Sequence, residues 1–152
     1  MKLKILQIKE TLGCAVSSPD IAASMMAEEA KADRECFWVL HLNVANKIIE
    51  KELVSMGTVS NSLVHPREIF KKAIVNGASG IITVHNHPGG QAHPSKDDKL
   101  VWDKLDEAGK ILGIHVLDHI IITPTGRYYS QKGERMFPEK EVSKDEKGNK
   151  LF

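Results

Sequence analysis

In the segment Gly80-Ile81-Ile82-Thr83-Val84-His85-Asn86-His87-Pro88, a short apolar run rich in β-branched residues ends in two histidines. Such a run, bounded by glycine, predicts a buried strand. Side chains two residues apart on a strand point to the same face, so His85 and His87 can reach one metal ion together. Pro88 also favours extended backbone at His87.

The sequence predicts a helix soon after this strand. Ser95 is typical of an N-cap, and residues 96 to about 112 carry apolar side chains at helical spacing. Asp98 would lie in the first turn, where the helix dipole favours its ionised form and its carboxylate can face the histidines. Two imidazoles and one carboxylate leave one position of a tetrahedral zinc ion open, which distinguishes catalytic from structural sites. We therefore predict a metal site formed by His85, His87 and Asp98.

Each of these residues also has an ordinary explanation. Ser95-Lys96-Asp97-Asp98 fits a capping box, in which the aspartate satisfies a backbone donor of the helix rather than a metal. A single histidine at the end of a strand is commonly a polar residue near a loop. The combination of strand, paired histidines, turn, capped helix and acid favours the metal.

The length and composition indicate one soluble domain. The chain has 152 residues, of which 41% are hydrophobic and 27% charged. We expect the domain over residues 1–137, followed by a charged and mobile tail over residues 138–152. The net charge of +1 gives no global attraction to nucleic acid or to an anionic membrane. Because the apolar runs are too short to span a bilayer and no signal peptide is apparent, we expect a cytoplasmic protein without a membrane partner.

Helices and strands alternate along the rest of the chain. We expect helices over Pro19 to about Ala32 and Arg67–Val75, and strands over Cys36–Leu42, Lys47–Val54, Val116–Thr123 and Arg127–Ser130. Short turns join two pairs of strands, so these pairs are expected to be antiparallel. The predicted fold class is α/β (α+β), with a mixed, antiparallel-rich sheet flanked by helices.

Further motifs accompany the histidines, and together they resemble a known family. His85-Asn86-His87-Pro88 followed by Ser95-Lys96-Asp97-Asp98 is similar to the JAMM signature of MPN+ metallopeptidases. The resemblance is closer still to the bacterial RadC family. The blocks that look like those of RadC, in the same order, are Gly57-Thr58-Val59-Ser60-Asn61, His65-Pro66-Arg67-Glu68, His85-Asn86-His87-Pro88 and Leu117-Asp118-His119. This resemblance implies an MPN/JAB-like fold with a cytidine-deaminase-like layered architecture.

The resemblance also implies an activity. JAMM enzymes are zinc-dependent hydrolases of amide or isopeptide bonds in peptide or protein substrates, and zinc lowers the pKa of water from about 16 to near 7. These enzymes use a glutamate at the start of the strand after the first helix as general base, and the residue at the matching position is Glu35, with Glu68 in reserve. Ser95 resembles the JAMM serine that stabilises the oxyanion, a role that can coexist with that of N-cap.

Two other kinds of function stay open. RadC proteins are named for DNA repair, so the resemblance also implies a link to repair or to mobile elements through nucleic acid. The helix-hairpin-helix region of full-length RadC proteins is expected to be missing, because only about seventeen residues precede the first helix, and the net charge of +1 also argues against tight DNA binding. The other alternative is a noncatalytic scaffold. The complete set of His85, His87 and Asp98 argues against it, because degenerate relatives commonly lose these residues.

Overall fold

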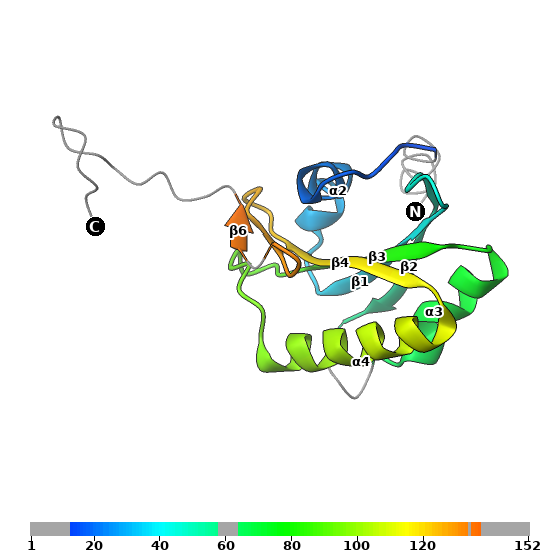
Figure 1. The fold of residues 1–152 in the computed structure, drawn as a ribbon. Helices are drawn as coiled ribbons and strands as arrows, with labels where there is room; N and C mark the ends of the chain where they lie inside the picture. The colour runs from blue at the N-terminus through cyan, green and yellow to red at the C-terminus, as the bar shows by residue number, and fades with distance from the viewer. Residues whose placement is uncertain (1–12, 58–63, 134, 138–152) are drawn as a thin grey trace, which may run out of the picture.

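The computed structural model describes residues 13–57, 64–133 and 135–137. Within them, a mixed sheet of six strands in the order β2-β1-β3-β4-β5-β6 forms the central layer (Figure 1). The strands are β1 (Cys36–Leu42), β2 (Ile48–Met56), β3 (Gly80–Asn86), β4 (His115–Ile122), β5 (Tyr128–Ser130) and β6 (Arg135–Phe137). The helical elements are α2 (Pro19–Met25), the 3₁₀ turn η1 (Glu29–Lys31), α3 (Pro66–Val75) and α4 (Lys96–Leu112).

The strand pairing confirms the antiparallel-rich sheet. β1 and β2 form the expected antiparallel hairpin, and β1 also pairs antiparallel with β3. β4, β5 and β6 pair antiparallel with one another in chain order. β3 and β4 are parallel, because α4 connects them and returns the chain to the same end of the sheet.

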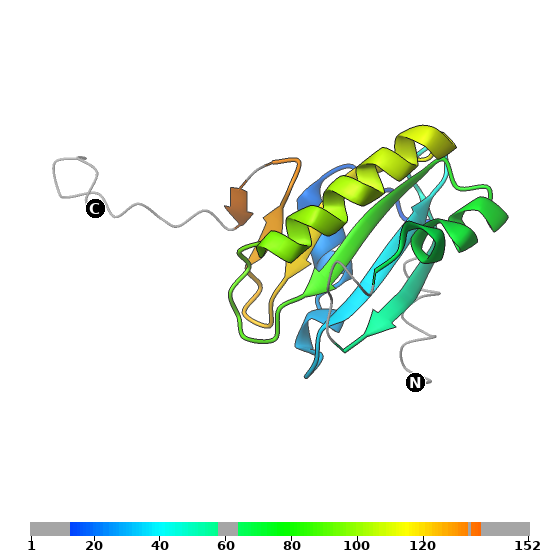
Figure 2. The same cartoon turned by 90° about the horizontal axis from the view of Figure 1, so that it is seen from below.

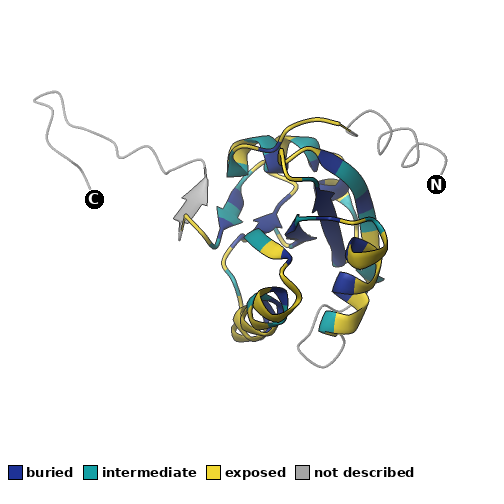
Figure 3. Ribbon diagram, turned by 45° about the vertical axis from the view of Figure 1, so that its right-hand side comes forward, coloured by how far each residue is buried: buried dark blue, intermediate teal, exposed yellow. Residues whose placement is uncertain are grey.

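Helices cover both faces of the sheet, so the fold has the predicted layered architecture (Figures 1 and 2). α3 and α4 lie on one face, over an apolar cluster that includes Phe37, Phe70 and Trp102. α2 lies on the other face, over a second cluster that includes Met26 and Trp38. The central strands are therefore buried between two layers (Figure 3). Side chains at the ends of these central strands are therefore attached to a rigid backbone.

The first helix is shorter than the sequence predicts. The helix expected to reach about Ala32 ends at Met25, and the separate 3₁₀ turn η1 follows it. Glu29 in this turn is buried and forms an ion pair with Lys51, which is buried in β2. This long-range pair overrides the local helical preference of the alanine-rich segment.

The other differences concern the C-terminal end. β6 is a three-residue strand that the sequence does not predict, and it lies within the domain expected to end at residue 137. The expected mobile tail over residues 138–152 lies outside the described residues.

Among the helices of the described ranges, none combines the length and the apolar character needed to cross a membrane.

Gly109 allows α4 to pack closely on the segment that follows it. A Cβ atom at Gly109 would lie 2.7 Å from the carbonyl oxygen of Ile114 and 3.0 Å from Cγ2 of Val116. In an open helix, Gly→Ala is stabilising by about 1 kcal/mol. Here we expect Gly109→Ala to lower the free energy of unfolding by about 1–3 kcal/mol in urea denaturation, because the new methyl group displaces backbone.

Gly89→Ala is the matched control, since nothing lies within 4 Å of a Cβ atom built there. We expect it to change the free energy of unfolding by less than about 0.5 kcal/mol. A more stable Gly109→Ala variant would contradict the close packing of α4.

Candidate metal centre

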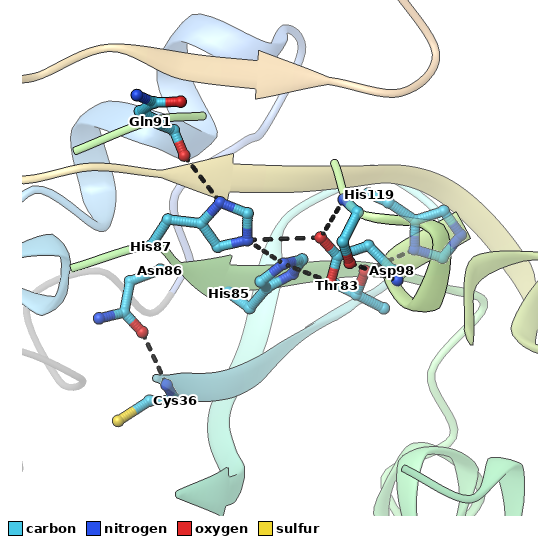
Figure 4. Close-up of polar contacts among 9 residues, drawn as sticks. Cys36, Thr83, His85, Asn86, His87, Gln91, Asp98 and His119 are labelled. Atoms are coloured by element: carbon cyan, nitrogen blue, oxygen red, sulfur yellow. Dashed lines mark hydrogen bonds and ion pairs between the residues drawn. The ribbon is translucent and has the colours of Figure 1, made fainter. Parts of the chain in front are cut away.

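His85 lies at the end of β3, His87 follows the last residue of this strand, and Asp98 lies in the first turn of α4 (Figure 4). The Nε2 atoms of the two histidines are 3.2 Å apart. Oδ1 of Asp98 lies 3.1 Å from Nε2 of His85, and Oδ2 lies 3.4 Å from Nε2 of His87. The three side chains singled out from the sequence thus converge and form a group that could hold a metal ion.

The distances and burial of this group fit a tetrahedral divalent metal. With metal–ligand bonds of about 2.0–2.2 Å, neighbouring ligand atoms of a tetrahedral ion are about 3.3–3.6 Å apart. The separations here are 3.1–3.4 Å, which is within about 0.2 Å of these values. The side chains of His85 and Asp98 are 1% and 5% exposed, so the group needs a proton or a cation between its members to offset burial. Nitrogen and oxygen donors together suit zinc.

Hydrogen bonds determine how His87 presents its ring. Nδ1 lies 2.8 Å from the carbonyl oxygen of Gln91. Because a carbonyl only accepts, Nδ1 carries a hydrogen. The protonated ring then donates to Asp98 from Nε2, whereas the neutral ring has its lone pair on Nε2 and can bind a metal there. The backbone N–H of His87 donates to the carbonyl of Ile122 at 2.9 Å, which fastens the loop after β3 to β4.

Asp98 is at once a helix cap and a candidate ligand. Oγ of Ser95 accepts a hydrogen bond from the backbone N–H of Asp98 at 3.0 Å, and Oδ2 of Asp98 accepts one from the backbone N–H of Ser95 at 2.8 Å. This is the capping box that the sequence offered as the alternative to a metal site. The carboxylate also contacts both imidazoles, so its role in the cap is compatible with the proposed role as a ligand. The cap orients the carboxylate toward the histidines.

The neighbouring groups shift the protonation of the site. Burial raises the pKa of Asp98, but the hydrogen bonds from His85 and His87 outweigh it and hold this pKa well below its usual range. Burial lowers the pKa of His87, but the hydrogen bonds with Asp98 and Gln91 raise it. The negative charges of Asp98 and Glu35 act in the same direction, so the pKa of His87 lies above its usual value. The carboxylate is therefore ionised at neutral pH, and a metal competes with a proton for His87.

Aromatic rings hold His85 in place. Its ring is stacked on that of Phe37, with centroids 5.9 Å apart and planes 8° apart. Trp102, one helical turn after Asp98 in α4, lies 6.3 Å from the His85 ring. Nδ1 of His85 has no hydrogen-bond partner in the part of the chain that the structure describes. Ring packing and the contact of Nε2 with Asp98 therefore orient this imidazole.

His119 continues this support behind Trp102. The two rings are stacked, with centroids 5.3 Å apart. The imidazole of His119 also lies 2.5 Å from Oγ1 of Thr83 and 2.8 Å from Oδ1 of Asp106. His119 belongs to the block Leu117-Asp118-His119 of the RadC resemblance, and the structure places it behind Trp102, beneath the site.

Glu35 lies directly before β1, beside the histidines. Phe37 pairs with His85 in the antiparallel β1–β3 ladder. The ladder ends at this pair, and Glu35 and His87 each lie two residues beyond it, at the same end of the two strands. The effect of the Glu35 charge on the pKa of His87, opposed by burial, agrees with this placement.

Glu68, the reserve candidate for the base, lies elsewhere. It is exposed in α3, and its carboxylate is 3.8 Å from Nε of Arg67. Burial raises the pKa of Glu52 in β2, and the charge of Glu68 adds to this shift. The structure therefore brings Glu35 rather than Glu68 toward the histidines.

Asn86 fastens the segment that carries Glu35, a role that the sequence did not reveal (Figure 4). Its side chain is fully buried, and Oδ1 accepts a hydrogen bond from the backbone N–H of Cys36 at 2.7 Å. Nδ2 donates to the carbonyls of Arg34 at 2.9 Å and Ala32 at 3.4 Å. These partners are at least 50 residues away in the chain, so no local pattern marks the contact. The only feature of the sequence that points to Asn86 is its position between the candidate ligands His85 and His87.

We expect Asn86→Ala to lower the free energy of unfolding of the metal-free protein by about 2–4 kcal/mol, because it removes the amide group that accepts from the buried backbone N–H of Cys36 and donates to the carbonyl of Arg34. Urea denaturation measures the difference. Gln91→Ala is the control, since the side chain of Gln91 is exposed and only its carbonyl contacts His87. Equal stability of the two variants would show that the hydrogen bonds of the Asn86 side chain contribute little to folding.

The chain matches known proteins over most of its described length. The RadC-like JAB domain family matches residues 16–136. A UPF0758 protein of Methanosarcina mazei is 46% identical over 120 residues, which are 78% of this chain and 52% of the relative. A UPF0758 protein of Desulforudis audaxviator is 48% identical over 123 residues, which are 80% of this chain and 53% of the relative. The chain thus spans about half the length of the curated relatives it matches.

The matched region contains the elements that build the site, from the segment before β1 to the strands β4 and β5. It therefore includes both histidines, the capped helix with its aspartate and the glutamate before β1. On the extent of this match and the identity of its relatives, the chain belongs to the RadC-like JAB domain family.

Proposed function

We propose that this domain is a zinc-dependent hydrolase of amide or isopeptide bonds. The observation that carries the proposal is the convergence of two imidazole nitrogens and a buried carboxylate within 3.1–3.4 Å of one another. Membership of the RadC-like JAB domain family supports the same chemistry. A peptide or protein substrate and a cytoplasmic location are parts of this proposal.

In this proposal, His85, His87 and Asp98 hold the zinc ion. Zinc bound there would supply Lewis acidity, which lowers the pKa of water from about 16 to near 7 and polarises a carbonyl group. The capping box of Asp98, the carbonyl contact of His87 and the rings around His85 orient these side chains without the metal. Such preorganisation limits the rearrangement that binding requires.

Glu35 is the proposed general base. Its carboxylate takes a proton from the attacking water, and the water oxygen forms a bond to the carbonyl carbon of the substrate. Glu35 then returns the proton to the leaving nitrogen as the carbon–nitrogen bond breaks, which yields one carboxylic acid and one amine. The contacts of Asn86 on both sides of Glu35 hold the backbone of this segment in place.

Ser95 is proposed to stabilise the oxygen that becomes negative during attack. Its Oγ accepts from the backbone of Asp98, which leaves its hydroxyl hydrogen available to donate. Ser95 is exposed at the N-terminus of α4, where the positive end of the helix dipole also favours negative charge.

A cleavage assay with and without zinc tests the proposal. Zinc-loaded protein is incubated with a peptide library and with isopeptide-linked peptides, and newly formed amino groups are measured. We expect hydrolysis that is lost when a chelator removes the metal and returns when zinc is added back. Hydrolysis at an undiminished rate by the metal-free protein would contradict a metal-dependent mechanism.

A further inference from the structure

A second group of metal-ligating side chains lies on the β1–β2 hairpin. His41 in β1 pairs with Glu50 in β2, and Val39 pairs with Glu52. Directly opposite residues of antiparallel strands point to the same face of the sheet. Val39 belongs to the core cluster beneath α3 and α4, so His41, Glu50 and Glu52 face this covered side.

His41 is buried without a hydrogen-bond partner. Its side chain is 0% exposed, and neither ring nitrogen has a hydrogen-bond partner within the described ranges. The same holds for Oε2 of Glu52, which lies 3.4 Å from Nε2 of His41. A buried polar group left unpaired costs about 1–3 kcal/mol. Two such groups facing each other point to a bound species that satisfies both.

The geometry of the group suits a divalent cation. One ligand atom each from His41, Glu50 and Glu52 lies within 4.8 Å of the other two. Nε2 of His41 and Oε2 of Glu52 are 3.4 Å apart. This distance lies within the range of about 3.3–3.6 Å between neighbouring ligand atoms of a tetrahedral zinc site. One imidazole with two carboxylates is a donor set that zinc accepts.

The charges around the group also favour a cation. Two carboxylates and the single ammonium of Lys72 leave a net negative charge on the cluster.

Lys72 competes with a metal for Glu50, but weakly. Nζ of Lys72 lies 3.3 Å from Oε1 of Glu50, and Nδ2 of Asn76 lies 3.3 Å from Oε2. The Lys72 side chain is 53% exposed and can turn into solvent. Because a solvent-exposed ion pair contributes only about 0–1 kcal/mol, a divalent ion displaces it at little cost.

We propose that His41, Glu50 and Glu52 form a second zinc site, separate from the group at His85. Phe37, which pairs with His85, and His41 are four residues apart in β1, a distance of about 13 Å along the strand. A metal in this position would join the edge strand β2 to β1 beneath α3. Its role would be to stabilise the hairpin, because a metal that binds only the folded chain shifts the equilibrium toward folding.

Zinc content tests the second site without any substrate. Wild-type protein and variants are equilibrated with excess Zn²⁺, desalted and analysed by elemental mass spectrometry. The double variant His85→Ala/Glu52→Gln gives the background of weak surface binding. Above that background, we expect two equivalents in the wild type and in Glu107→Gln, a control at an exposed acid in α4. We expect one equivalent in Glu52→Gln and one in His85→Ala.

The outcomes separate the two sites. A wild type with one equivalent that His85→Ala loses entirely would overturn the second site and leave the proposed hydrolase site intact. Equal zinc in Glu52→Gln and Glu107→Gln would also overturn it. Lys72→Met gives a second readout of opposite sign, because removal of the competing ammonium should tighten zinc at this site by about two- to fivefold. Unchanged or weaker binding in Lys72→Met would count against the site.

Discussion

Asp98→Asn and His85→Ala are each expected to weaken zinc binding at the candidate metal centre by more than about 100-fold. Asp98→Asn removes the negative charge that faces both Nε2 atoms, and His85→Ala removes one of these atoms. The measurement is made in a Glu52→Gln background, so that the hairpin site does not contribute. Zinc content after desalting should then fall from about one equivalent to the background.

Asp97→Asn is the matched control for this experiment. Asp97 precedes Asp98 in the first turn of α4 and carries the same charge, but its side chain is exposed. We expect this variant to keep its zinc, with circular dichroism showing that all variants are folded. Retention of zinc by Asp98→Asn and His85→Ala at the level of Asp97→Asn would refute the ligand assignment.

Glu35→Gln is expected to lower the rate of amide hydrolysis by about 10²–10⁴-fold, the usual contribution of general acid–base catalysis. Glutamine has the same shape but cannot take a proton from water. The variant should keep its zinc, because Glu35 belongs to the segment before β1 and not to the converging group. The hydrolysis rate of a library substrate and the zinc content are measured on the same protein sample. A lower rate with unchanged zinc content shows that a base, and not the metal, has been lost.

Glu68→Gln is the control for Glu35→Gln, because it removes the reserve candidate in exposed α3. We expect this variant to hydrolyse substrate at the wild-type rate. A fully active Glu35→Gln with an inactive Glu68→Gln would move the role of base to Glu68.

The elements that form the site follow closely from local sequence. β1 has the predicted bounds Cys36–Leu42, and α4 begins after Ser95 as its capping residue predicts. Alternation along β3 explains why His85 and His87 meet. Capping fixes where Asp98 lies. These features depend on neighbours within a few residues, which is why a single sequence shows them.

The features that the sequence did not show depend on distant partners. Asn86 lies between two predicted ligands, but its hydrogen bonds reach Cys36 and Arg34 across the sheet. The buried pair of Glu29 and Lys51 replaces the expected end of the first helix by a 3₁₀ turn. His41 looked like part of an ordinary strand, and only the register with β2 brings Glu50 and Glu52 beside it.

A zinc-edge anomalous difference map from crystals grown with zinc tests the candidate metal centre most directly. We predict a peak about 2.0–2.2 Å from Nε2 of His85, Nε2 of His87 and a carboxylate oxygen of Asp98. Crystals that contain zinc but show no peak among these three side chains would contradict the proposed metal centre.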